Sequence, residues 1–79
     1  MFNYYPRQKV FCFEKSPHEE VQFSVGERNG NLFVDIRVFY VQEDGSRVWT
    51  QKGIYLFREK LPALKEGLER LLEAVQAKA

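Results

Sequence analysis

Hydrophobic and polar side chains alternate along the first three quarters of the chain. In residues 21–25 apolar side chains flank Gln22 and Ser24, and this period of two is typical of a half-buried β-strand. Residues 32–41 and 48–57 have similar strand-like sequence. The pattern therefore predicts three strands.

Two dipeptides separate these strands, Asn29-Gly30 and Asp44-Gly45. Each favours a tight β-hairpin, because both central residues of a type I′ turn need positive φ. A further strand is predicted at residues 9–14, and a proline shortly after it ends the ladder, since proline has no N–H to donate. The strands are thus expected to form a four-stranded antiparallel sheet.

The period of the apolar residues changes to about 3.6 from residue 59 onward, which predicts an amphipathic helix. Pro62 suits the first turn of that helix, where its missing N–H costs nothing. The apolar stripe comprises Leu61, Leu64, Leu68, Leu71, Leu72 and Val75. The predicted fold class is α+β, a four-stranded antiparallel sheet followed by one C-terminal amphipathic helix. It forms a single domain of residues 1–79, of which residues 1–8 and 77–79 are expected to be loose.

The leucine stripe has two interpretations: the helix covers its own sheet, or it pairs with the helix of a second chain. A chain of 79 residues buries only roughly 60% of its unfolded surface as a monomer. Cys12 is the single cysteine, so no intrachain disulfide can support the fold. We therefore favour a homodimer, with an interface formed by Leu64, Leu68, Leu71, Leu72 and Val75.

Charge and composition narrow the class of protein. Twelve Lys and Arg residues stand against eleven Asp and Glu residues, a formal net charge of +1, without the basic excess that is typical of nucleic-acid binders. No apolar run approaches the ~20 residues of a membrane span, and the N-terminus lacks the layout of a signal peptide. We expect a reduced, cytoplasmic protein with no membrane contact.

The chain offers little for catalysis. His18 is the sole histidine, and no ligand set of Cys, His or carboxylates surrounds it in the sequence, so a solvated loop histidine is expected. No glycine-rich phosphate loop follows a strand, and no Ser/His/Asp set can form. Cys12 lies in a strand-like run and is expected to be a small buried residue. We expect a protein that is not an enzyme and that uses no cofactor or metal.

The central strand, residues 32–41, carries large apolar side chains on both faces. One face is predicted to be core: Leu32, Val34, Ile36 and Val38. The other combines aromatic and charged side chains: Phe33, Asp35, Arg37 and Phe39. This second face suits either a protein contact, such as a dimer face, or unpaired nucleic acid, whose bases stack on aromatic rings while cations hold phosphates. The residues alone leave both interpretations open.

The order of residues in "RNGNLFVDIRVFYVQEDGSRVWTQKGIYL", residues 28–56, resembles the transcriptional coactivator p15 family, also called positive cofactor 4 (PC4). The core pattern of that family is a glycine, then [VI]-D-I-R-x-[YF]-[YWF], a turn with glycine, and a K-G-I-x-L strand. The matching positions are Gly30, Val34-Asp35-Ile36-Arg37, Phe39-Tyr40, Gly45 and Lys52-Gly53-Ile54-Tyr55-Leu56. The resemblance covers residues 21–72.

This resemblance implies a curved sheet and a dimer joined through the helices, with grooves for single-stranded DNA. It implies that Arg37 touches phosphate and that Phe39 or Tyr40 stacks on a base. It also implies that Lys52 touches the DNA backbone beside Gly53, where the strand bends. Within this family the chain looks like a compact bacterial or phage-type member, which is an intracellular protein.

Some residues of this chain depart from the family pattern. Arg28 replaces the aromatic and lysine residues expected around the first hairpin, and Glu19 and Glu20 stand where a basic residue is expected. Arg28, Arg47 and Trp49 are added as candidate nucleic-acid contacts. We expect weak binding that is sensitive to salt.

The leading hypothesis is a homodimer that binds single-stranded DNA, or RNA, with low sequence specificity. It would act in transcription, replication or repair, together with transcription or replication proteins. The alternative is a protein-interaction module, or a Pur-like nucleic-acid-binding module, that uses the same aromatic face.

Overall fold

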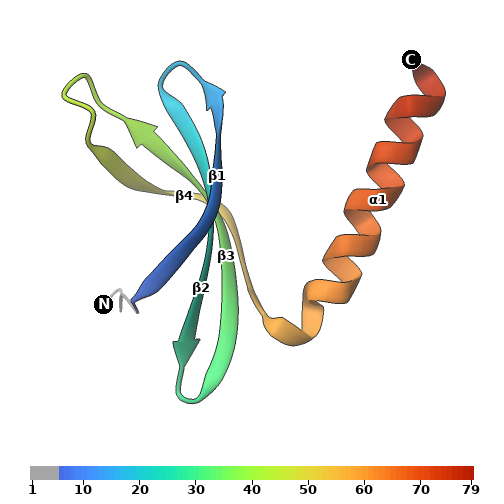
Figure 1. Ribbon diagram of the computed structural model, residues 1–79, viewed down its shortest axis with the longest axis horizontal. Coiled ribbons are helices and arrows are strands. Elements are labelled where there is room, and N and C mark those ends of the chain that lie inside the picture. Colours follow the sequence, from blue (N-terminus) through green and yellow to red (C-terminus); the bar gives the residue numbers. More distant parts are fainter. Residues whose placement is uncertain (1–5) are drawn as a thin grey trace.

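The computed structural model describes residues 6–79, as four strands followed by one helix (Figure 1). The elements are β1 (Arg7–Ser16), β2 (Glu19–Arg28), β3 (Asn31–Val41), β4 (Arg47–Phe57), a 3₁₀ turn η1 (Arg58–Lys60) and α1 (Leu61–Lys78). The predicted fold class is confirmed. Both ends that were expected to be loose contain regular structure, because β1 begins at Arg7 and α1 continues to Lys78. Residues 1–5 of the expected loose N-terminus lie outside the described part of the chain.

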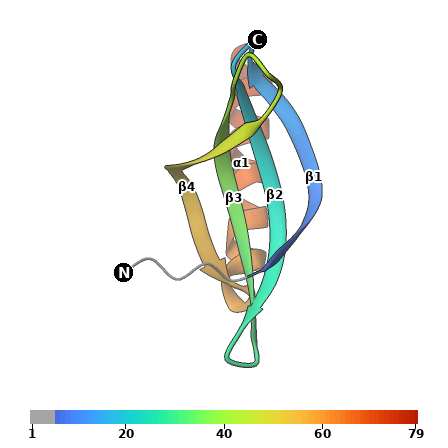
Figure 2. The ribbon, with the colours of Figure 1, turned by 90° about the vertical axis from the view of Figure 1, so that its left-hand side faces the viewer.

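The four strands form one antiparallel sheet in the order β1-β2-β3-β4. β2 and β3 pair without a register shift from Glu19↔Tyr40 to Arg28↔Asn31, so the central hairpin is regular. The outer strands are irregular, because β1 shifts its register against β2 and β4 shifts its register against β3. Such bulges increase the local twist of a sheet, and the strands are visibly bowed along their length (Figure 2).

The two hairpin predictions have different outcomes. Asn29 and Gly30 have φ values of 52° and 81°, so the type I′ turn between β2 and β3 is confirmed. Between β3 and β4, Gly45 has a φ of 87°, but Asp44 is not among the described residues with positive φ. The prediction of a type I′ turn at Asp44-Gly45 is therefore wrong.

The loop between β3 and β4 has three residues, 43–45, between the hydrogen-bonded pair Gln42 and Ser46. Gly45 N donates to Gln42 O at 2.9 Å, and Gln42 N donates to Ser46 O at 2.9 Å. The carboxylate of Asp44 accepts a hydrogen bond from Ser46 N at 2.9 Å. This side-chain bond holds the chain in an Asx-type turn with negative φ at the aspartate, and the glycine alone takes the left-handed conformation.

The two faces of the sheet are packed in the opposite way to the prediction. We call the face with Phe33, Asp35, Arg37 and Phe39 the aromatic face, and the face with Leu32, Val34, Ile36 and Val38 the aliphatic face. On the aromatic face Phe33 is fully buried and Asp35 is only 2% exposed. On the aliphatic face Leu32 is 41% exposed, and the next three aliphatic side chains are half-buried. The assignment of the core to the aliphatic face of this chain is therefore wrong.

Neighbouring strands explain the burial of Phe33. Tyr55 of β4 stacks on the Phe33 ring with the ring centroids 4.8 Å apart. Arg7 of β1 places its guanidinium carbon 5.3 Å from the centroid of the same ring. An arginine can cover an aromatic ring with its planar group and its aliphatic stem, so residues that look hydrophilic in the sequence bury this phenylalanine.

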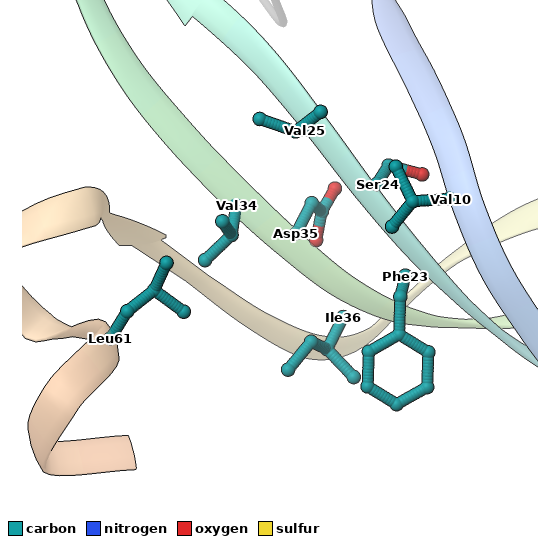
Figure 3. Close-up of a pocket in the computed structure, with 8 residues that line it drawn as sticks. All are labelled: Val10, Phe23, Ser24, Val25, Val34, Asp35, Ile36 and Leu61. Atoms are coloured by element: carbon teal, nitrogen blue, oxygen red, sulfur yellow. The ribbon is translucent and has the colours of Figure 1, made fainter. Parts of the chain in front are cut away.

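The aliphatic face contains an open hollow of about 200 Å³ where α1 begins (Figure 3). Its apolar lining consists of Val10, Phe23, Val25, Val34, Ile36 and Leu61. Leu61 comes from the first turn of α1 and the other side chains come from β1, β2 and β3. The helix thus meets the aliphatic face only near its own start.

Beyond its first turn, α1 extends away from the sheet (Figure 1). Its apolar stripe is largely exposed in the single chain, from 53% at Leu68 to 64% at Val75. No residue of α1 is buried. Beyond its first turn the helix therefore does not cover its own sheet, so the first interpretation of the leucine stripe is wrong for this chain.

β4 contains two extra residues relative to β3. Gly53 pairs with Arg37, whereas the next aligned pair is Trp49 with Phe39. The segment between the two pairs is therefore longer on β4, and β4 makes a sharp corner there (Figure 2). Gly53 has a φ of 157°, and a Cβ at this position would collide with the backbone carbonyl of Ile36. The bulge thus requires glycine.

We expect Gly53→Ala to lower the free energy of unfolding by about 2–4 kcal/mol, because the added methyl group forces the backbones of β3 and β4 apart. Gly67→Ala is the matched control, since a Cβ at Gly67 meets no atom within 4 Å. It should stabilise the exposed helix by about 0.5–1 kcal/mol. Urea denaturation followed by circular dichroism measures both changes, and equal stability of the two variants would contradict the steric requirement.

Candidate nucleic-acid interface

An ion triad lies at the centre of the aromatic face. The carboxylate of Asp35 contacts Arg7 Nε at 3.0 Å through Oδ2, and Arg37 Nη2 at 2.9 Å through Oδ1. Arg37 Nε adds a hydrogen bond of 3.1 Å to Oδ1. All three side chains are nearly buried. A buried carboxylate is stable only with such partners, so the triad ties β1 to β3.

Arg37 also connects the triad to the bulge of β4. Its Nη1 donates to the backbone carbonyl of Gln51 at 3.0 Å, and its guanidinium carbon lies 4.9 Å from the centroid of the Trp49 ring. Nε, Nη1 and Nη2 of Arg37 thus all donate within the protein. Arg37 positions the tryptophan and the bulge from within the sheet.

Two aromatic rings lie opposite each other on β3 and β4. Phe39 and Trp49 are cross-strand partners, and both are half-buried. Their register places both on the aromatic face, two residues beyond the Arg37↔Gly53 pair along β3. The structure therefore brings together Arg37, Phe39, Trp49 and Gly53, which the sequence analysis had singled out separately.

Two cations lie at the same end of the sheet. Lys52 is exposed within the bulge, and its backbone N donates to Thr50 Oγ1 at 3.2 Å. Arg47 is half-exposed and contacts Glu20 of β2 at 3.4 Å. A hydrogen bond of 2.8 Å from Arg47 Nη1 to Gly45 O fixes the guanidinium against the loop between β3 and β4.

Glu20 of β2 is the acidic residue that contacts Arg47. Gln22 Nε2 donates to its Oε2 at 2.7 Å. This hydrogen bond, followed by that from Arg47, lowers the pKa of the Glu20 carboxyl below its ordinary value. Glu20 is therefore an anion at neutral pH and neutralises part of the cationic surface.

Two of the predicted contact residues lie elsewhere. Arg28 ends β2 at the opposite end of the sheet, beside the type I′ turn. Tyr40 alternates onto the aliphatic face, is 48% exposed, and stacks on His18 with the ring centroids 6.2 Å apart. The structure does not bring these two side chains into the cluster around Trp49.

The structure also places the residues that were considered for other chemistry. Cys12 is a free, half-buried thiol on β1, and His18 takes part in the ring stack with Tyr40. Within residues 6–79 no group of three or more His, Cys, Asp or Glu side chains is arranged to hold a metal ion. None of the helices in that part of the chain has the length and apolarity needed to cross a membrane.

Sequence reasoning missed Arg7 and Gln22. Arg7 lies within residues 1–8, which were expected to be loose, and nothing in its spacing shows that β1 returns it to Asp35. Gln22 looked like an ordinary solvent-facing position of an alternating strand. Both contacts depend on strand register, which residue type alone does not reveal.

Comparison with known proteins identifies the family. The sequence profile of the family Transcriptional Coactivator p15 (PC4) matches residues 15–67, which is more than half of the chain. The chain therefore belongs to the transcriptional coactivator p15 (PC4) family, and the predicted resemblance is confirmed. No curated protein sequence matches the chain.

Solved structures share the fold. A PC4 homologue from Burkholderia pseudomallei K96243 superposes in its orthorhombic crystal form with a TM-score of 0.76 at 29% identity, over 92% of this chain and 96% of that chain. Its tetragonal form gives 0.75 at 29% identity, over 87% and 98%. A bacteriophage T5 homologue of the eukaryotic transcription coactivator PC4, implicated in recombination-dependent DNA replication, gives 0.70 at 21% identity, over 89% and 81%.

We expect Asp35→Asn to lower the free energy of unfolding by about 3 kcal/mol, because it leaves two nearly buried arginines without their carboxylate. Trp49 is the single tryptophan, so its fluorescence should shift to the red as Arg37 loses its fixed position beneath the ring. Glu66→Gln is the control, since it breaks only the exposed Glu66–Arg70 pair and should leave the midpoint of urea denaturation almost unchanged. A fully stable Asp35→Asn variant with unchanged emission would contradict the role of the triad.

Proposed function

We propose that this protein binds single-stranded DNA with low sequence preference, through the end of the aromatic face that carries Phe39 and Trp49. One observation carries the proposal: these two rings are cross-strand partners, with the cations Arg47 and Lys52 on the adjoining part of β4. Membership of the p15 (PC4) family supports it. The protein supplies no chemical step and acts by holding exposed DNA strands during transcription or replication.

The mechanism combines base stacking with phosphate contacts. Each base that stacks on an aromatic side chain contributes about 1–3 kcal/mol, whatever its identity. Duplex DNA hides its base faces, so the rings select unpaired strands. Arg47 and Lys52 hold phosphates beside the rings. Arg37 acts as a positioning residue, because its donors are already used by Asp35 and Gln51.

Arg28 and Tyr40 lie outside this surface. Arg28 lies at the far end of the sheet, and Tyr40 is next to Phe39 in the chain but lies on the aliphatic face. Arg28 meets the same ligand only when the DNA strand is long enough to pass from one end of the sheet to the other, and Tyr40 only when the strand also wraps onto the aliphatic face. A series of oligonucleotide lengths separates their contribution from that of the Trp49 cluster.

We expect a labelled single-stranded oligonucleotide of about 20 nucleotides to bind more tightly than the duplex of the same sequence, with an affinity that falls as salt rises. Fluorescence anisotropy measures both, and an RNA strand of the same sequence tests the preference for DNA. Trp49→Ala should weaken binding by about five- to a hundredfold. Phe11→Ala, which removes an exposed aromatic ring from β1, is the control and should change the affinity less than about twofold.

Lys52→Ala provides a second test that does not remove a packed side chain. It should weaken binding to all sequences alike and make the dependence of log K on log salt shallower by about 0.7. Equal affinity for single strands and duplex, or unchanged binding by both the tryptophan and the lysine variants, would refute the proposed site. Capture of a protein in place of DNA would favour an interaction module.

The functional unit we propose is a homodimer. The single chain exposes 6393 Å², whereas a compact monomer of its mass of 9.4 kDa exposes about 5,000 Å². The difference exceeds the roughly 800 Å² that each partner buries in a standard interface. The stripe of α1 supplies suitable apolar surface at the half-buried Leu64 and at the exposed Leu68, Leu71, Leu72 and Val75.

We expect Leu71→Gln to weaken self-association at least about a hundredfold, because the leucine is lost once from each of two copies of the interface. Glu69→Gln introduces the same side chain on the polar face of α1 and should leave the dimer intact. Sedimentation equilibrium measures the dissociation constant. A wild-type protein that is monomeric at all concentrations would refute the proposed dimer.

A further inference from the structure

Glu20 lies in line with the two aromatic rings of the proposed site. It pairs with Phe39 of β3, which in turn pairs with Trp49 of β4. On its other side Glu20 pairs with Glu14 of β1. One row across the aromatic face therefore contains two carboxylates followed by two rings. A DNA strand that stacks on the rings brings its phosphates close to the Glu20 carboxylate.

One hydrogen bond within β2 orients the Glu20 carboxylate toward Arg47. Gln22 Nε2 donates to Oε2 at 2.7 Å, and the side chain of Glu20 is only 13% exposed. Arg47 approaches side-on, with Nε 3.4 Å from Oε2 and Nη2 3.4 Å from Oε1. Two parallel N–H···O contacts of this kind are also how arginine binds a phosphate. Glu20 thus occupies the edge of Arg47 that a phosphate would use.

The contact between the two side chains is suited to exchange. Its distances of 3.4 Å are longer than the ~2.7–2.9 Å of a strong charge-assisted hydrogen bond. The side chain of Arg47 is 47% exposed, so solvent screens the pair. Its Nη1 is anchored to the carbonyl of Gly45, which keeps the guanidinium in place when Glu20 is displaced.

We propose that Glu20 is an intramolecular competitor for phosphate, which occupies Arg47 in the free protein and must be displaced when a nucleic-acid strand binds. The inference rests on the proposed function, because it assigns a regulating role within the same surface. In the free protein the carboxylate pairs with Arg47, and the energy of this pair is lost when a phosphate takes its place. Glu20 therefore holds the affinity below the value that the rings and cations alone would give.

The test is the affinity of Glu20→Gln for a labelled single strand of about 20 nucleotides over a salt series. The amide keeps the shape of the side chain and removes its charge. We expect binding about two- to fivefold tighter at low salt, with a gain that shrinks as salt rises because salt screens the Glu20–Arg47 pair. Glu27→Gln is the matched control, since Glu27 is an exposed residue of the same strand on the aliphatic face. It changes the net charge equally and should gain less than about twofold.

A second comparison ties the gain to one contact. In an Arg47→Gln background, Glu20→Gln should improve binding no more than Glu27→Gln does, because no guanidinium remains to be released. An equal gain in both backgrounds would overturn the proposal in favour of a general charge effect. An unchanged Glu20→Gln affinity in a protein that does bind single strands would overturn the competitor role alone. Absence of binding by the wild type and every variant would overturn the proposed function as well.

Discussion

The paired charges of Asp35, Arg7 and Arg37 determine where the remaining parts of the aromatic face lie. A carboxylate that is only 2% exposed requires both guanidinium groups to be in place. One guanidinium comes from β1 and the other from β3, so the register of the outer strand is set by electrostatics as well as by the ladder. Arg37 also contacts the Gln51 carbonyl and the Trp49 ring. The ion pairs that hold Arg37 in place therefore also fix the bulge of β4.

The elements could be predicted from the sequence because their signals are local. Alternation, the Asn29-Gly30 turn and the change of period before α1 each depend on a few neighbouring residues, and each is present in the structure. The buried face could not be predicted, because it depends on an arginine that is 28 positions from its carboxylate. The loop at Asp44 differed because the aspartate side chain binds Ser46, which stabilises a backbone geometry other than the one its dipeptide favours.

The candidate site was predictable in its composition but not in its division of roles. The family pattern and the unusual density of aromatic residues pointed to Arg37, Phe39, Lys52 and Gly53. Side-chain geometry then changes what one of these residues can do, since Arg37 donates to the protein on all three nitrogens. The pairing of Glu20 with Arg47 could not be predicted from the sequence either, because the two residues belong to β2 and β4, which are separated by β3 in the sheet.

The extra length of β4 is an even number of residues, and this parity decides on which face of the sheet the indole lies. Side chains of a strand alternate between faces, so an excess of two residues between Trp49 and Gly53 leaves both on the side of their partners Phe39 and Arg37. A change of two residues in this segment therefore preserves the side of the sheet on which the indole lies. A change of one residue would turn the ring to the aliphatic side unless a further bulge absorbed it, as the bulge of β1 does between Lys9 and Phe11.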